Sequence, residues 1–166
     1  MRFRRKQRKL ILDFLTIAIP ILSVIIIYFG MQFVLATDTP LVTVASGSMR
    51  PALEVGDLVL IHGIPASSIQ IEDIIVFDSP EGAHTIHRVT RIEILQNGTI
   101  QFKTQGDANP DEDLKWILEQ NVHGRVIYRI PYIGWLALDP TIPIIIISII
   151  IIIALLWPQR RRRLRR

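Results

Sequence analysis

The sequence predicts a mainly β domain inserted between an N-terminal and a C-terminal transmembrane helix. Two long apolar segments lie near the ends of the 166-residue chain, and each adjoins a strongly basic run. The residues between them form short β-branched or aliphatic runs separated by Gly, Pro, Asp and Ser, which is typical of strands and turns. We therefore divide the chain into a basic arm at 1–9, a helix at 10–36, a β-domain at 37–140, a second helix at 141–157 and a basic tail at 158–166.

The basic residues are concentrated at the two ends of the chain. Six of the first nine residues are Lys or Arg, and six arginines follow Trp157. Residues 36–140 instead contain seven Lys or Arg and fourteen Asp or Glu. Basic runs beside apolar segments follow the positive-inside rule of membrane proteins, and we expect no nucleic-acid partner. The pattern predicts a multi-pass protein of the cell membrane, with both termini in the cytoplasm and the middle domain outside.

The first apolar segment, 10–36, has Asp13 as its one formal charge and contains Pro20, which membrane helices tolerate. The alternative is a cleavable signal peptide that ends at Ala36. Such peptides have apolar cores of about 7–15 residues, so the length of this segment favours an uncleaved anchor.

The second apolar segment, 142–157, is dominated by isoleucine. A helix of this length extends about 24 Å, slightly less than the roughly 30 Å hydrocarbon core. A buried soluble helix therefore stays an alternative. The arginines after Pro158 favour a membrane span, because such a block anchors a helix on the cytoplasmic side.

Strands are predicted at 58–61, 74–77, 86–90 and 122–128. The runs 91–95 and 99–103 alternate apolar and polar residues on either side of Asn97-Gly98, which predicts a hairpin with a two-residue turn. Asn97-Gly98-Thr99 is also a glycosylation sequon, but a tight turn explains these residues better.

No cofactor and no metal are expected from the sequence. The chain has no cysteine, which excludes disulfides and thiolate metal sites. The acidic stretch 106–113 lacks the oxygen spacing and central glycine of an EF-hand, so a solvated loop is the better interpretation.

The residues of greatest chemical interest are Ser46-Gly47-Ser48-Met49-Arg50-Pro51, which follow an alternating run at 41–45. By itself this segment is a polar turn. Downstream, however, lie His87 within a predicted strand and Asp113. Serine, histidine and aspartate can supply a nucleophile, a general base and a group that orients the base. Gly47 lets the backbone turn closely behind the Ser48 hydroxyl, where N–H groups can receive an oxyanion.

Taken together, three motifs resemble the type I signal peptidases of the archaeal and endoplasmic-reticulum branch. They are the segment 46–51, Ile86-His87-Arg88-Val89, and Gly106-Asp107 with Asp113 six residues later. The similarity covers about residues 42–135 and includes Gly124-Arg125 and Pro131-Tyr132-Ile133-Gly134. Bacterial members pair the serine with a lysine, whereas His87 occupies the matching position here. Ala108 departs from the family, which usually has asparagine after the Gly-Asp pair.

The resemblance implies a membrane-bound serine endopeptidase that removes N-terminal signal peptides from exported precursors after a small residue. It implies that Ser48 is the nucleophile, His87 the general base and acid, and Asp113 its acidic partner. Asp107 matches a second acidic position, with either a catalytic or a structural role. Ser46 corresponds to a hydroxyl that supports the oxyanion site.

The same resemblance implies small, apolar substrate pockets, with walls expected near Met49 and Leu53. Signal peptides, membrane lipid and the protein-export translocon are the expected partners. The apolar stretch 130–136 contains Tyr132 and Trp135, which favour the membrane interface. Two other classes stay open: a membrane-tethered self-cleaving or regulatory serine hydrolase of the same fold, and a non-catalytic scaffold.

Overall fold

A computed structural model describes residues 2–79, 82, 84–139, 141, 143, 145, 148 and 149. The helices are α1 (Arg2–Leu35) and the short α2 (Trp135–Leu138), with two 3₁₀ turns at Ala66–Ser68 and Glu119–Asn121. The strands are β1 (Leu41–Thr43), β2 (Leu58–His62), β3 (Ile74–Asp78), β4 (His84–Ile94), β5 (Ile100–Gln105), β6 (Ile117–Leu118) and β7 (Val122–Ile130). The mainly β domain after an apolar helix is therefore confirmed.

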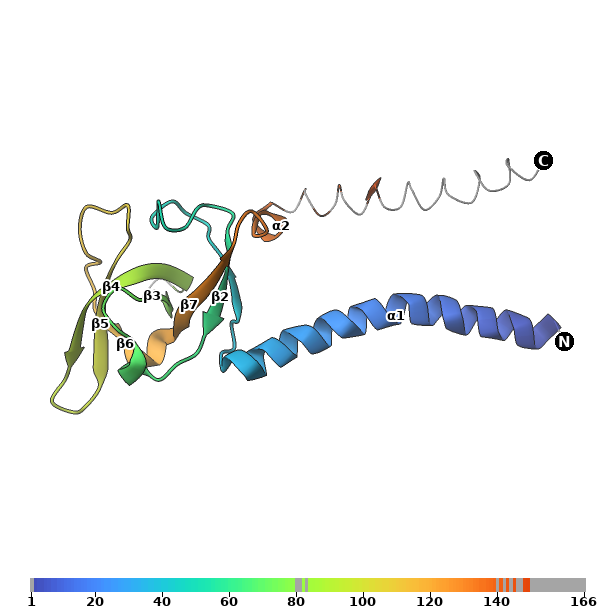
Figure 1. The fold of residues 1–166 in the computed structure, drawn as a ribbon, viewed down its shortest axis with the longest axis horizontal. Coiled ribbons are helices and arrows are strands. Elements are labelled where there is room, and N and C mark those ends of the chain that lie inside the picture. The colour runs from blue at the N-terminus through green and yellow to red at the C-terminus, as the bar shows by residue number, and fades with distance from the viewer. Residues whose placement is uncertain are drawn as a thin grey trace.

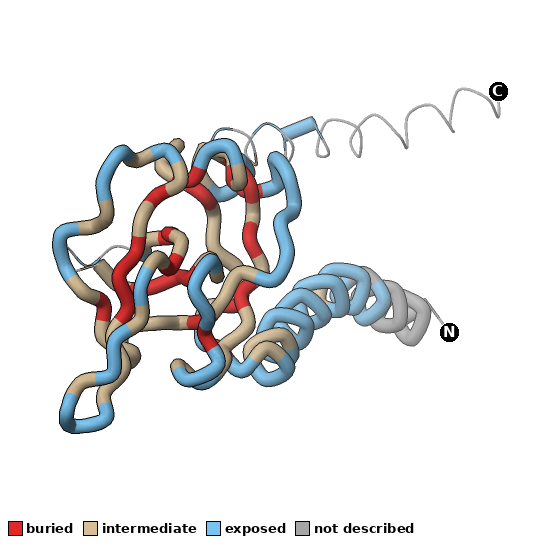
Figure 2. Tube along the Cα trace, turned by 60° about the vertical axis from the view of Figure 1, so that its left-hand side comes forward, coloured by how far each residue is buried: buried red, intermediate tan, exposed pale blue. Residues whose placement is uncertain are grey.

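Helix α1 extends away from the β-domain as a long, gently curved helix that contains Pro20 (Figure 1). Its segment Phe14–Leu35 spans 22 residues with a mean hydropathy of 2.4, which is long and apolar enough to cross a bilayer. The side chains described along it are mostly exposed (Figure 2). The helix begins at Arg2, so the predicted basic arm at 1–9 continues the same helix.

The end of α1 is fixed to the β-domain by hydrogen bonds. The Gly63 N–H donates to the Leu35 carbonyl oxygen over 2.8 Å, and the Thr37 hydroxyl donates to the His123 carbonyl oxygen over 3.0 Å. Most of the predicted second helix, 141–157, and the whole basic tail, 158–166, lie outside the described residues.

The seven strands form one antiparallel sheet in the order β1-β2-β7-β3-β4-β5-β6. The pairing register shifts between Leu60 and Ile61 on β2, between Val76 and Phe77 on β3, and between Val89 and Arg91 on β4. Such irregularities bend a strand and increase its twist, which lets the sheet curve around its own side chains.

Successive residues of a strand point to opposite faces, and the sheet therefore has two apolar clusters. Val76 packs on one face, in the cluster of Val44, Met49, Leu53, Val59, Ile61 and Ile86. Ile75 and Phe77 pack on the other face with Ile69, Val89, Phe102 and Ile117. Figure 2 shows the buried residues concentrated in this β part of the chain.

The predicted strands at 58–61, 74–77 and 122–128 are all present, and the runs 86–90 and 91–95 form one continuous strand, β4.

The predicted two-residue hairpin turn is wrong, because the loop contains three residues. The Leu95 N–H donates to the Thr99 carbonyl oxygen and the Gly98 N–H donates to the Leu95 carbonyl oxygen, so Gln96, Asn97 and Gly98 form a three-residue loop. Gly98 has φ 83°, as the third residue of such a loop requires. The two-residue strand β6 was not predicted, because it is too short to show a pattern.

Candidate active site

Ser48 lies in the turn that follows β1, and this turn is anchored by the residue after it. The Met49 side chain is 1% exposed and packs in the same cluster as Val44 and Leu53. The Arg50 N–H donates to the Gly47 carbonyl oxygen over 3.2 Å, and the Leu53 N–H donates to the Met49 carbonyl oxygen over 2.9 Å. The buried methionine therefore holds the turn in place while the serine hydroxyl reaches the surface of the sheet.

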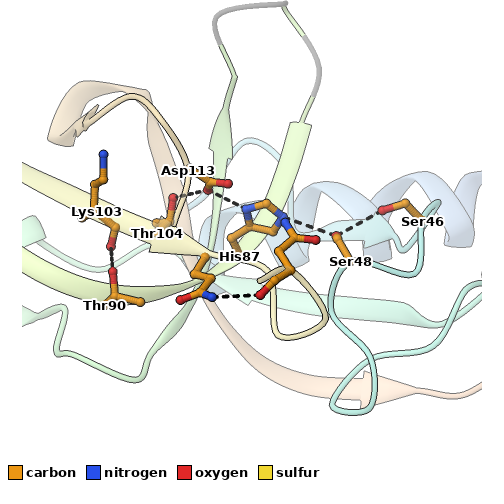
Figure 3. Close-up of polar contacts among 9 residues, drawn as sticks. Ser46, Ser48, His87, Thr90, Lys103, Thr104 and Asp113 are labelled. Atoms are coloured by element: carbon orange, nitrogen blue, oxygen red, sulfur yellow. Dashed lines mark hydrogen bonds and ion pairs between the residues drawn. The ribbon is translucent and has the colours of Figure 1, made fainter. Parts of the chain in front are cut away.

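A continuous row of hydrogen bonds joins Ser48, His87 and Asp113 (Figure 3). The Ser48 Oγ lies 3.3 Å from the His87 Nε2, and the His87 Nδ1 lies 2.6 Å from the Asp113 Oδ2. His87 comes from β4, is 8% exposed and packs edge-on against the Phe77 ring, with ring centroids 6.3 Å apart. The three side chains predicted to act together are thus in contact in the order serine, histidine, aspartate.

Asp113 is also held by Thr104 on β5, a residue that the sequence did not indicate. The Thr104 hydroxyl donates to the Asp113 Oδ2 over 2.6 Å, and the Asp113 N–H donates to the Thr104 carbonyl oxygen over 2.8 Å. Thr104 is fully buried. One carboxylate oxygen therefore accepts from both Thr104 and His87, which fixes the direction in which Asp113 meets the imidazole. No sequence signal distinguishes this threonine from any other strand threonine.

Ser46 lies on the far side of the Ser48 hydroxyl from His87, with the two serine Oγ atoms 3.2 Å apart. The backbone of Ser48 is held from behind, because the Ala108 N–H donates to its carbonyl oxygen over 2.8 Å. This contact uses only the backbone of residue 108, so the alanine there does not weaken it. Gly106 allows the approach, since a Cβ at that position would lie 2.7 Å from the Ser48 carbonyl oxygen.

Asp107 does not join the row of hydrogen bonds that contains His87. Instead both of its carboxylate oxygens accept from Arg88, at 2.9 and 2.7 Å. Arg88 also donates to the Glu72 carbonyl oxygen over 2.8 Å. The hydrogen bonds that Arg88 donates to Asp107 raise the pKa of Arg88 above its usual value. Asp107 thus ties the loop at 106–113 to β4, the strand that carries His87.

Comparison with known proteins gives the same family as the motifs. The Peptidase S24-like family matches residues 20–127. The human signal peptidase complex catalytic subunit SEC11C is 31% identical over 140 residues, which cover 79% of this chain and 72% of the relative. The SEC11 subunit of the fungus Schizophyllum commune is 31% identical over 157 residues, covering 80% and 81%. The chain belongs to the type I signal peptidase family.

Two hollows meet at His87 in this signal peptidase family member. One, of about 300 Å³, lies on the Ser48 side and is lined by Ser46, Ser48, Met49, His84, Thr85 and Asn109, among others. The other, of about 320 Å³, lies on the Asp113 side and is lined by Phe77, Ser79, Thr85, Leu114, Lys115 and Ile117, among others. Of the two residues expected near the substrate pocket, Met49 lines the first hollow, whereas Leu53 packs in the core.

A second polar cluster in the same signal peptidase chain consists of Asp78, His84 and His123. The Asp78 Oδ1 lies 2.8 Å from the His84 Nδ1 and 2.9 Å from the His123 Nε2. The hydrogen bond from His123 lowers the pKa of Asp78, and the contact with His84 acts in the same direction. The sequence did not indicate this cluster, because strand pairing alone brings His123 to Asp78, which lies 45 positions earlier in the chain.

Proposed function

We propose that this protein is a membrane-bound serine endopeptidase that removes signal peptides from exported precursors. The observation that supports this most strongly is the unbroken hydrogen-bond row from Ser48 through His87 to Asp113. The similarity to catalytic subunits of the signal peptidase complex supports the substrate class.

The chemistry follows from the geometry of the three side chains. His87 Nε2 accepts the Ser48 proton as Oγ attacks the scissile carbonyl carbon, and Asp113 stabilises the imidazolium that forms. The imidazolium then protonates the leaving amine as the peptide C–N bond breaks. His87 next removes a proton from water, which hydrolyses the acyl ester on Ser48. The Ser46 hydroxyl and the Ser48 N–H supply hydrogen bonds to the oxyanion.

The position of Asp113 supports its role as an orienting group. Its Oδ2 faces His87 Nδ1 at 2.6 Å, so the imidazole carries its hydrogen on Nδ1 and presents the Nε2 lone pair to Ser48. Asp107, bound to Arg88, acts on the reaction only by fixing the loop beside the site.

The substrate enters as an extended chain along the two hollows that meet at His87. The Ser48-side hollow has an apolar floor formed by Val44, Met49 and Ile86, all of which are buried. This arrangement favours a small side chain before the scissile bond.

Helix α1 anchors the enzyme in the bilayer, the segment 141–157 spans it again, and the catalytic domain faces the outside. Lipid and the export translocon are the proposed partners.

The direct test is cleavage of a model precursor by full-length protein in liposomes. Ser48→Ala and His87→Ala are each expected to lower kcat by about 10⁴- to 10⁶-fold, and Asp113→Asn by about 10⁴-fold, as in other serine peptidases. His62→Gln, which changes a histidine on β2 outside the row, serves as the control. Wild-type rates in the Ser48→Ala variant would contradict the proposal.

The self-cleaving and scaffold alternatives give different results in the same assay. A scaffold would cleave no precursor at any enzyme concentration. A self-cleaving hydrolase would process its own chain near Ala36, which N-terminal sequencing of the purified wild-type protein would reveal. The proposal requires an intact N-terminus together with precursor cleavage.

A further inference from the structure

The cluster of Asp78, His84 and His123 is separate from the hydrogen-bond row at Ser48, and none of its members takes part in the proton transfers of the proposed reaction. Its three side chains come from three neighbouring strands. Asp78 ends β3 and pairs in register with His84, the first residue of β4. His123 follows Val122 of β7, which pairs with Phe77 of β3. Sheet pairing therefore fixes the three residues at one end of the same three strands.

The three side chains converge on one point. Among the described residues, one ligand atom from each member lies within 4.8 Å of the other two. Asp78 Oδ1 is 2.8 Å from His84 Nδ1 and 2.9 Å from His123 Nε2, and the two imidazole rings are perpendicular with centroids 4.8 Å apart. In a tetrahedral zinc site the metal–ligand bonds of about 2.0–2.2 Å separate neighbouring ligand atoms by about 3.3 Å. Small side-chain rotations bring the cluster to that spacing.

We propose that Asp78, His84 and His123 form a binding site for a divalent transition-metal ion of the zinc type. Two imidazoles and one carboxylate are ligands that such ions prefer over Ca²⁺ or Mg²⁺, which take oxygen ligands. When the ion binds, it takes the place of the hydrogens on the two ring nitrogens that face Asp78 Oδ1. Each imidazole then carries its hydrogen on its other ring nitrogen. The carboxylate supplies negative charge, so the bound ion has a net charge of about +1 with these ligands.

The site is accessible and has an open coordination position. The Asp78 and His84 side chains are 47% and 45% exposed, whereas His123 is 24% exposed. Three protein ligands leave a fourth position of the tetrahedron for water or another ligand. His84 also lines the hollow beside Ser48, so a bound ion would stand at the wall of that hollow. It would also crosslink β3, β4 and β7 at one end.

The test uses full-length protein purified in detergent without a histidine tag and stripped with a chelator. Calorimetric titration with Zn²⁺ is expected to give one ion per chain, and Co²⁺ is expected to give the visible absorption bands of a tetrahedral site. Removal of a residue that only hydrogen-bonds to a metal ligand lowers metal affinity by roughly 10- to 100-fold. We expect a larger loss of Zn²⁺ affinity in each of His84→Gln, His123→Gln and Asp78→Asn, because each of these variants removes a ligand itself.

Two control variants separate this site from other places where Zn²⁺ can bind. Asp113→Asn alters the other His–Asp pair of the described chain, and His62→Gln removes a histidine outside both clusters. Both are expected to keep the wild-type affinity. Loss of binding in Asp113→Asn with retention in His84→Gln would overturn the proposal, because the ion would then occupy the pair at Ser48.

A further measurement needs no variant and so does not depend on how substitutions affect folding. X-ray absorption at the zinc edge of the wild-type protein should show two imidazole ligands and two oxygen or nitrogen ligands at about 2.0–2.2 Å. A spectrum with six oxygen ligands, or no binding at all in the calorimeter, would overturn the proposal. Neither readout depends on peptidase activity, so the metal site and the proposed function fail or stand separately.

Discussion

The Oδ2 atom of Asp113 accepts two short hydrogen bonds, one from His87 and one from Thr104. Both donors lie on strands, and both are buried, so the carboxylate has little freedom to rotate. A carboxylate fixed in this way keeps the imidazole in one tautomer and one orientation, which the proposed proton transfer from Ser48 needs. In the proposed mechanism, the position of the imidazole thus depends on Asp113, which takes no proton itself.

Thr104 is therefore expected to be a positioning residue. Thr104→Val keeps the shape of the side chain but removes the hydrogen bond to Asp113, and we expect kcat to fall by about 10- to 100-fold with little change in KM. Thr104→Ser keeps the hydroxyl and should restore most of the rate. Steady-state kinetics on a model precursor measure both variants. A wild-type rate in Thr104→Val, with the loss confined to Thr104→Ser, would indicate that packing of the γ-methyl group, and not the hydroxyl, matters.

In the proposed mechanism, the protonation state of His87 sets the pH dependence of the reaction. A protonated imidazole has no lone pair on Nε2 and cannot accept the Ser48 proton, and histidines change charge between about pH 5 and 8. We expect kcat/KM to fall as pH decreases across this range. A flat profile, under conditions where chemistry limits the rate, would contradict the role of His87 as base.

At the scale of elements, the pair of Arg88 and Asp107 joins β4 to the loop that carries Asp113. The Arg88 and Asp107 side chains are 26% and 15% exposed, so this ion pair is partly shielded from water. The guanidinium makes two parallel hydrogen bonds to the carboxylate, a geometry that is both strong and directional. The same loop supplies the Ala108 N–H that binds the Ser48 carbonyl oxygen.

Asp107→Asn is expected to act through this loop and not through proton transfer. Loss of a charge-assisted hydrogen bond in a partly shielded pair should lower the free energy of unfolding by about 1–3 kcal/mol. Activity should fall less than in Asp113→Asn, and its pH profile should keep the wild-type shape. Chemical denaturation together with kinetics measures these effects. A full loss of activity with unchanged stability would instead assign Asp107 to the reaction itself.

At the scale of the whole molecule, α1 and the β-domain are joined at a defined contact. The Gly63 N–H caps the Leu35 carbonyl oxygen at the helix end, and Gln32 Nε2 donates to the Asp38 carbonyl oxygen over 2.7 Å. The helix therefore enters the domain through hydrogen bonds as well as through the chain. For a membrane anchor, such a contact limits how far the active site can swing from the bilayer surface.

The proposed orientation can be tested with single cysteines, because the chain has none of its own. Asn97→Cys, in the exposed hairpin loop between β4 and β5, should react with an impermeant thiol reagent added to intact cells. Gln7→Cys, in the basic arm, should react only after lysis. The opposite labelling pattern would place the β-domain in the cytoplasm.

The sequence by itself determined the apolar helix, most strands and the residue types of the candidate site. These features depend on local composition: β-branched runs bounded by Gly and Pro predicted β2, β3 and β7, and a Ser-Gly-Ser turn with His87 and Asp113 downstream predicted the hydrogen-bonded row. Sequence similarity then assigned the family.

Only the tertiary structure decided which side chains share a partner. Thr104 meets Asp113, Asp107 meets Arg88, and His123 meets Asp78 because sheet register and the loop after β5 bring distant positions together. The hairpin loop at Gly98 also required the actual register, since two- and three-residue loops both accept glycine at a position with positive φ. Local preferences specify elements, but strand pairing specifies neighbours, and the chemistry of this protein depends on those neighbours.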